Sequence, residues 1–218
     1  CLLLVLPLIS PPEPRAVLGA AQSVSTEKPH LCVHTRLIDE VQEWKIQLSL
    51  EAVREMGASS IVEFFPWAYI ERSPGHYDWE QADRIIRHAQ NQGLRVIARM
   101  GYVPDWARPQ QETEFTTLNL LVEESIDNFA NFTAAFAARY RDTVNHIIIW
   151  NEPNLAFEWG YRNVDPVGYT AVLAAVYPRI KAAHPEMVVM GGALAPTLEP
   201  PGSINGLNDL LYLEAMLD

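Results

Sequence analysis

Short apolar runs alternate with longer amphipathic stretches along most of the chain. The apolar runs have the length of β-strands, and the stretches between them repeat apolar residues at the three- and four-residue spacing of a helix face. Ile147, Ile148 and Ile149 follow one another without polar alternation, which is typical of a parallel strand covered on both faces. We expect strands at residues 31–37, 59–65, 94–100, 144–150 and 187–193.

The amphipathic stretches predict helices, and some of their ends carry recognisable signals. Gly57 and Gly93 are expected to end the first two helices, because glycine accepts the left-handed backbone that follows a helix. Asp78 is the expected N-cap of the second helix, and Pro178 predicts a kink or an early stop in the fourth. The expected helices lie at residues 46–57, 78–93, 126–140 and 165–183, and from 208 onward.

Strand–helix units of this kind predict an α/β fold with a parallel sheet. Eight units close a (β/α)8 TIM barrel, so residues 31–218 would supply about the first five units of an incomplete barrel. The competing fold is an open, doubly wound sheet, which binds a cofactor at a glycine-rich turn after its first strand. That turn is missing, because His34, Thr35 and Arg36 stand in its place.

Charge and composition narrow the classes of function. The chain has 27 acidic and 16 basic side chains, a formal net charge of -11, which argues against a nucleic-acid partner. With 49% hydrophobic and 20% charged residues it has the composition of an ordinary globular protein. Its 2 cysteines cannot form a disulfide framework, and no Cys or His pair has the short spacing of a zinc site. We therefore expect no structural metal.

The first 30 residues differ from the rest of the chain. Residues 2–9 form an apolar run that is too short to span a bilayer, and prolines and small residues follow it. The run resembles the end of a secretory signal, so we expect residues 1–30 to be a truncated export segment with a linker. An ordered arm that packs on the domain and a lipid-carrying Cys1 are the alternatives. Export predicts a secreted or cell-envelope protein whose mature domain is not inserted in a membrane.

A carboxylic acid directly follows the fourth predicted strand. Asn151, Glu152 and Pro153 come after the apolar run, and the proline stiffens the turn that holds the acid. Partial burial disfavours the ionised form of a carboxyl group, so Glu152 is expected to stay protonated near neutral pH and to donate to a leaving group. Asn151 offers donors and an acceptor to a hydroxyl-bearing substrate. A Glu at a strand end can instead serve only to cap the next turn.

Four segments at the predicted strand ends are residues 33–35 (VHT), 63–67 (EFFPW), 101–107 (GYVPDWA) and 150–154 (WNEPN). In this order they resemble the retaining glycoside hydrolases of clan A, nearest to families 39 and 5. The resemblance implies that residues 31–218 are the N-terminal part of a TIM-barrel catalytic domain. It also implies an enzyme that cleaves a β-linked poly- or oligosaccharide with retention, and that needs neither a metal nor an organic cofactor.

The resemblance further implies that Glu152 acts as general acid and then as general base, and that Asn151 binds the sugar 2-hydroxyl. A retaining enzyme also needs a carboxylate nucleophile about 5 to 5.5 Å away, which this clan carries at the end of strand seven. Glu63, Glu158 and Glu199 lie near predicted loops, but none follows a seventh strand. We assign no nucleophile and expect it beyond residue 218. A carbohydrate-binding pseudo-enzyme that lacks the second carboxylate is the alternative.

Other side chains at the strand ends complete the expected substrate site. Sugar rings stack their apolar C–H faces on aromatic side chains, while their hydroxyls need polar partners. The residues expected to bind substrate are Trp67, Trp106, Trp159, His34 and Glu63. Each has a structural alternative, either as a buried aromatic that anchors a loop or as a polar group bonded to its neighbours. Arg36 and Arg99 stand near strand ends and could hold nearby carboxylates ionised.

Overall fold

The computed structural model describes residues 14–109 and 117–218. These residues contain a sheet of parallel strands in the order β1-β2-β3-β4-β5. The strands are β1 (Cys32–Thr35), β2 (Ser60–Pro66), β3 (Arg95–Gly101), β4 (His146–Ile149) and β5 (Val188–Gly191). Every predicted strand is confirmed: β2 and β3 are shifted by one residue, and the other strands are shorter than predicted.

Helices connect the strands and follow the predicted periodicity. The α-helices are α1 (Glu43–Glu55), α2 (Trp67–Ile70), α3 (Glu80–Asn91), α4 (Ile126–Arg139), α5 (Pro166–Ala183) and α6 (Asp209–Leu217). Short 3-10 helices are η1 (Leu37–Asp39), η2 (Asp105–Ala107) and η3 (Glu123–Ser125). The short α2, which starts directly after β2, had no counterpart among the predicted helices.

One predicted helix cap is wrong. Trp79, not Asp78, is the N-cap of α3, although an Asp78 carboxylate oxygen accepts a hydrogen bond from the Glu80 N–H at 3.2 Å. Asp78 thus still satisfies one of the free N–H groups at this helix end. Of the two effects expected of Pro178, the early stop does not occur: α5 continues to Ala183, where the helix was expected to end. Packing of the buried face of α5 outweighs the one hydrogen bond that proline removes.

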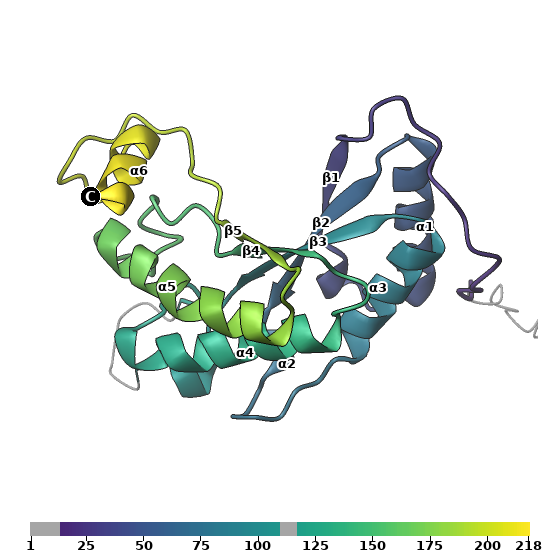
Figure 1. Cartoon of the computed structure of the whole chain (residues 1–218), viewed down its shortest axis with the longest axis horizontal. Coiled ribbons are helices and arrows are strands. Elements are labelled where there is room, and N and C mark those ends of the chain that lie inside the picture. Colours follow the sequence, from purple (N-terminus) through teal and green to yellow (C-terminus); the bar gives the residue numbers. More distant parts are fainter. Residues whose placement is uncertain (1–13, 110–116) are drawn as a thin grey trace, which may run out of the picture.

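The strand order identifies the sheet as part of a barrel. In a doubly wound sheet the strand order reverses once and helices cover both faces. Here each strand pairs with its neighbours in the sequence, and α1, α3, α4 and α5 lie on one side of the curved sheet (Figure 1). The alternative of an open, doubly wound sheet is therefore wrong. The chain forms consecutive βα units of a (β/α)8 barrel.

The sheet has a helix-covered face and an inner face. The helix-covered face carries completely buried side chains such as Phe65, Ala98 and Ile147, which belong to the hydrophobic core. Phe65 packs against Phe136 of α4, with ring centroids 5.1 Å apart. Alternate positions such as Arg99 and Ile148 are only half-buried and define the inner face. Since successive side chains of a strand point to opposite faces of the sheet, a residue's odd or even position along the strand decides which face it occupies. The inner face is the one that can present side chains to a ligand.

The residues that precede β1 lie against the C-terminal end of α3. The Gln22 N–H donates to the Asn91 carbonyl at 2.7 Å, and the Asn91 side chain donates to the Gly19 carbonyl at 3.0 Å. The apolar run of the predicted export segment, residues 2–9, lies outside the described residues. In the described part of the chain, no helix combines the length and the apolar character needed to cross a membrane.

We expect Gly93→Ala to destabilise the fold more than Gly75→Ala. Both glycines have positive φ, 70° and 75°, a conformation that costs other residues roughly 1–2 kcal/mol. A Cβ on Gly93 would also lie 2.8 Å from the Gln22 carbonyl oxygen, whereas nothing lies within 4 Å at Gly75. Urea denaturation measures both losses. Equal losses would show that the segment around Gln22 does not press against Gly93.

Candidate active site

Loops at the carboxyl ends of β3 and β4 contain strained backbone. Tyr102 follows β3 with a φ of 60°, and Trp150 and Glu152 follow β4 with φ values of 74° and 38°. Residues with side chains rarely adopt this left-handed region, at a cost of order 1–3 kcal/mol each. Such strain persists where surrounding contacts enforce it, and it concentrates at functional sites. The carboxyl ends of the strands are also where (β/α)8 barrels place their active sites.

Buried side chains hold the loop that carries Glu152. The Trp150 indole is buried, and its Nε1 donates to the Glu158 carbonyl oxygen at 2.7 Å. Asn154 is also buried, and its side-chain amide bonds the backbone of Ala195 and Leu207 at 2.9 to 3.0 Å. The Trp150 contact closes the loop on itself, and the Asn154 contacts tie the loop to the segment between β5 and α6. These contacts hold Trp150 and Glu152 in the left-handed backbone conformation.

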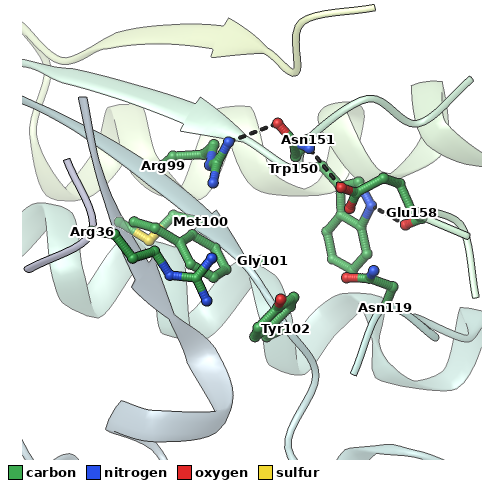
Figure 2. Close-up of a pocket in the computed structure, with 10 residues that line it drawn as sticks. Arg36, Arg99, Met100, Gly101, Tyr102, Asn119, Trp150, Asn151 and Glu158 are labelled. Atoms are coloured by element: carbon green, nitrogen blue, oxygen red, sulfur yellow. Dashed lines mark hydrogen bonds between the residues drawn. The ribbon is translucent and has the colours of Figure 1, made fainter. Parts of the chain in front are cut away.

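Asn151 is the centre of a network of polar side chains at this end of the sheet (Figure 2). Arg99 Nη1, from β3, donates to Asn151 Oδ1 at 2.7 Å. Asn151 Nδ2 donates to Glu158 Oε1 at 2.7 Å and lies 3.5 Å from Glu152 Oε2. Two carboxyl groups and a guanidinium therefore surround one amide. The side chains of Arg99, Asn151, Glu152 and Glu158 are all half-buried, so they lose only part of their contact with water when they form these interactions.

Three side chains of the network, Arg99, Asn151 and Glu158, line a small cavity of about 70 Å³ (Figure 2), and Glu152 is not among its lining residues. Arg36 and Arg99 both place their guanidinium groups over the Phe64 ring, 5.5 and 4.9 Å from its centroid, and Tyr102 meets that ring edge-on. The remaining lining residues are Met100, Gly101, Asn119 and Trp150. These polar groups suit a hydroxyl-rich ligand. Across the described ranges, no three His, Cys, Asp or Glu side chains come together as metal ligands.

Burial and charge control the ionisation of the network. Burial raises the pKa of Glu158, and the negative charge of Glu152 raises it too, whereas the Asn151 hydrogen bond and the Arg99 charge lower it. Burial lowers the pKa of Arg99, and the charges of Glu158 and Glu152 oppose that effect. The two carboxyl groups repel each other across the Asn151 amide. The Glu158 carboxyl is consequently easier to protonate than a carboxyl group in water.

Of the predicted site residues, only Asn151 lines the cavity, and Glu152 lies beside it. Asn151 and Glu152 lie side by side at the carboxyl end of β4, as expected. His34 is an exposed residue of β1 that pairs in register with Val62, and it does not line the cavity. It shares the inner face with Phe64 but lies further from the strand ends. A contact between His34 and substrate stays a prediction.

The structure corrects the substrate-binding role expected for Glu63. Its side chain is completely buried and accepts hydrogen bonds from the Thr35 hydroxyl at 2.5 Å and from the Leu37 and Ile38 N–H groups at 2.9 Å. Glu63 pairs in register with Ala98 and so occupies the helix-covered face. The position of Glu63 along the strand therefore directs its carboxylate away from the cavity. Glu63 instead holds the start of η1 against β2.

The three tryptophans expected to stack on sugar do not line the cavity. Trp67 and Trp159 are 0% and 2% exposed, so neither presents a ring face to a ligand. Trp67 packs edge-on against Trp106 at 5.4 Å, and Trp159 packs against Trp150 at 5.9 Å. Trp106 is half-buried, and its Nε1 donates to the Glu71 carbonyl oxygen at 2.8 Å. The structural alternative, a buried aromatic that anchors a loop, describes Trp67 and Trp159.

Several cavity residues were not among those expected to bind substrate. Glu158 was one of several acids near loops, and Arg99 was expected only to hold a nearby carboxylate ionised. Tyr102 lies in a segment that carried the resemblance but had no role of its own, and Asn119 carried no signal. The parity of β3 was the available clue for Arg99, because it alternates with Ala98 and Met100 and must face the opposite side of the sheet.

The fold and the site together define a barrel segment with an acid and an amide at the carboxyl ends of its strands. Solved structures with this architecture include a family 39 glycoside hydrolase from Bacteroides cellulosilyticus WH2, with a TM-score of 0.59, 23% identity and coverage of 74% of this chain and 31% of that one. A monomeric β-xylosidase from Caulobacter crescentus CB15 has a TM-score of 0.59, 20% identity and coverage of 80% and 38%.

An exo-β-1,4-mannosidase from Opitutaceae bacterium strain TAV5 also has a TM-score of 0.59, with 16% identity and coverage of 83% of this chain and 35% of that one. The chain thus spans well under half the length of each of these structures. No protein-family model and no curated protein matches the sequence. At these identities the likeness establishes the fold, and it confirms the TIM-barrel architecture that the sequence predicted.

Proposed function

We propose that the protein is a glycoside hydrolase that cleaves β-linked poly- or oligosaccharides with retention of configuration. The observation that carries the proposal is the placement of Glu152 at the carboxyl end of β4, beside an Asn151 amide that is bonded on both sides. The barrel structures that resemble this chain are named as glycoside hydrolases, which supports the same activity. We also propose that the protein is exported, as the apolar start of the sequence suggests.

In the proposed reaction Glu152 acts twice. A carboxylate nucleophile attacks the anomeric carbon, the glycosidic C–O bond breaks, and the Glu152 proton moves to the departing oxygen. The Glu152 carboxylate then takes a proton from water while the water oxygen attacks the same carbon and releases the nucleophile. Two inversions give net retention. Asn151 is proposed to bind the sugar 2-hydroxyl, an interaction that strengthens in the transition state.

We propose that the nucleophile comes from a barrel strand outside the described units. Glu63 faces the helices and is fully bonded there. Glu199, in the loop after β5, bonds the Ser203 hydroxyl and lies 3.5 Å from the Asn205 amide. Glu158 is bound to Asn151, on the same loop as Glu152. None of the three is assigned the role.

The test uses the protein expressed from its complete reading frame. Aryl β-D-xylosides and β-D-mannosides are the first substrates, because two of the similar structures are named a β-xylosidase and a β-mannosidase. Proton NMR of the first-formed sugar is expected to show the β-anomer. An α-anomer would contradict retention. Saturable binding of oligosaccharides without hydrolysis would identify the carbohydrate-binding pseudo-enzyme instead.

A further inference from the structure

We propose that Glu158 is a positioning residue that, together with Arg99, fixes the Asn151 side-chain amide beside Glu152. The inference rests on the proposed function, because it assigns Glu158 a task in the same site. Glu158 comes from the loop after β4 and Arg99 from β3. The two supports therefore reach Asn151 from different elements, and both line the cavity (Figure 2).

Asn151 has a donor on one side and an acceptor on the other. Arg99 Nη1 donates to Asn151 Oδ1, and Asn151 Nδ2 donates to Glu158 Oε1, both at 2.7 Å. Arginine can only donate, and an ionised carboxylate can only accept. Turning the amide by 180° would set two donors against each other and two acceptors against each other. The pair therefore permits one orientation of the amide.

That orientation directs Asn151 Nδ2 toward the reacting groups. One of its hydrogens is bonded to Glu158. The other is available to Glu152 Oε2, 3.5 Å from Nδ2, or to the sugar hydroxyl of the proposed reaction. An amide that turned freely would present its carbonyl oxygen to the Glu152 carboxylate for part of the time. Because Arg99 and Glu158 fix the amide, it does not have to rotate into position when the substrate reacts.

Glu158 is itself held in place. Its carbonyl oxygen accepts a hydrogen bond from the buried Trp150 indole at 2.7 Å, and its N–H donates to the Leu155 carbonyl at 3.1 Å. Only its side-chain torsions are left to be ordered. A support that is ordered before substrate arrives positions Asn151 at little further entropic cost.

Two charged groups face the Glu158 carboxyl: Glu152 from the same loop and Arg99 from β3. An ionised Glu158 is attracted by the Arg99 guanidinium and repelled by a negative charge on Glu152. Glu158→Gln removes the charge but keeps an oxygen that can accept from Asn151. Glu158→Leu removes both. The two variants separate the charge of Glu158 from its hydrogen bond.

We expect Glu158→Leu to lower kcat by roughly 10-fold or more with little change in KM, the order of one lost hydrogen bond to a charged group. Glu158→Gln is expected to retain kcat within about 5-fold, because its oxygen can still accept from Asn151. Glu186→Gln is the matched control, because Glu186 is exposed and precedes β5, at the end of the sheet opposite the site. Its kcat and KM should equal those of the unaltered protein.

The proposal is overturned if Glu158→Leu keeps its kcat, or if Glu158→Gln is as inactive as Glu152→Gln, which would make Glu158 a reacting group. Absence of hydrolysis by the unaltered protein would instead defeat the proposed function. NMR then still tests the positioning: the two Asn151 side-chain NH signals should be well separated and slow to exchange, and should collapse toward solvent-exposed values in Glu158→Leu. Unchanged signals would overturn the proposal without any activity.

Discussion

Glu152→Gln is expected to lower kcat/KM for glycosides with poor leaving groups by about 100- to 10,000-fold, the range that a positioned general acid or base contributes. Glutamine keeps the size of the side chain but cannot deliver a proton to the departing oxygen. The loop that holds Glu152 is fixed by the buried side chains of Trp150 and Asn154. The fold should therefore be unaffected, and thermal unfolding checks this.

The nature of the leaving group decides whether Glu152 is the acid. A dinitrophenolate leaves without protonation, so the first step of Glu152→Gln on a dinitrophenyl glycoside should be nearly unaltered while the second step is slow. A burst of dinitrophenolate is then expected, and azide, which needs no general base to attack, should restore turnover and give a β-glycosyl azide. Glu186→Gln serves as the control. Equal losses on good and poor leaving groups would remove Glu152 from this role.

The part of the site that sequence could predict is the part that is local. β4 is an unbroken apolar run, and Asn151 and Glu152 follow it directly, so their place at the strand end depends on no distant contact. The parallel sheet likewise follows from repeated βα units, and the missing glycine-rich turn favoured the sequential order of a barrel over a doubly wound sheet. These features need only the length and the polarity of neighbouring segments.

The face that Glu63 occupies could not be predicted in the same way. β2 is buried along its whole length, so no polar alternation marks its two faces. Only the register with β1 and β3 shows that Glu63 lies beside Thr35 and Ala98. An acid near a strand end therefore suggested a substrate contact, whereas its partners are the Thr35 hydroxyl and backbone N–H groups of η1.

The link between Asn151 and Glu158 depends on the shape of one loop. Trp150 and Glu152 adopt positive φ although neither is glycine, so the turn carries no glycine to reveal it. The loop folds back because Trp150 Nε1 bonds the Glu158 carbonyl and Asn154 bonds the loop after β5. These are tertiary contacts, and spacing along the chain does not show them. The same reason explains why Trp67 and Trp159 turned out to be buried.

Glu63→Leu is expected to lower the free energy of unfolding by about 2 to 5 kcal/mol, because it leaves two buried N–H groups without an acceptor, at about 1–3 kcal/mol each. Those groups belong to Leu37 and Ile38, and Glu63 accepts from each at 2.9 Å. Glu63→Gln should be far milder. Its oxygen can accept from both N–H groups, and its amide can donate to Thr35 Oγ1, whose hydroxyl can turn toward the Val62 carbonyl 3.4 Å away.

Acid titration provides the second arm of this prediction. Burial raises the pKa of Glu63 above its ordinary value of 4.5, although the hydrogen bonds oppose this. A carboxyl whose pKa is raised by folding stabilises the fold fully below its unfolded pKa, and this contribution is lost as the pH rises through the folded pKa. The free energy of unfolding of the unaltered protein, measured in urea from pH 4 upward, should therefore fall relative to that of Glu63→Gln, which has no such group. If the free energies of unfolding of the two proteins changed with pH in parallel, folding would not perturb the pKa of Glu63. If Glu63→Leu and Glu63→Gln were equally stable, the hydrogen bonds of Glu63 would not hold η1 to β2.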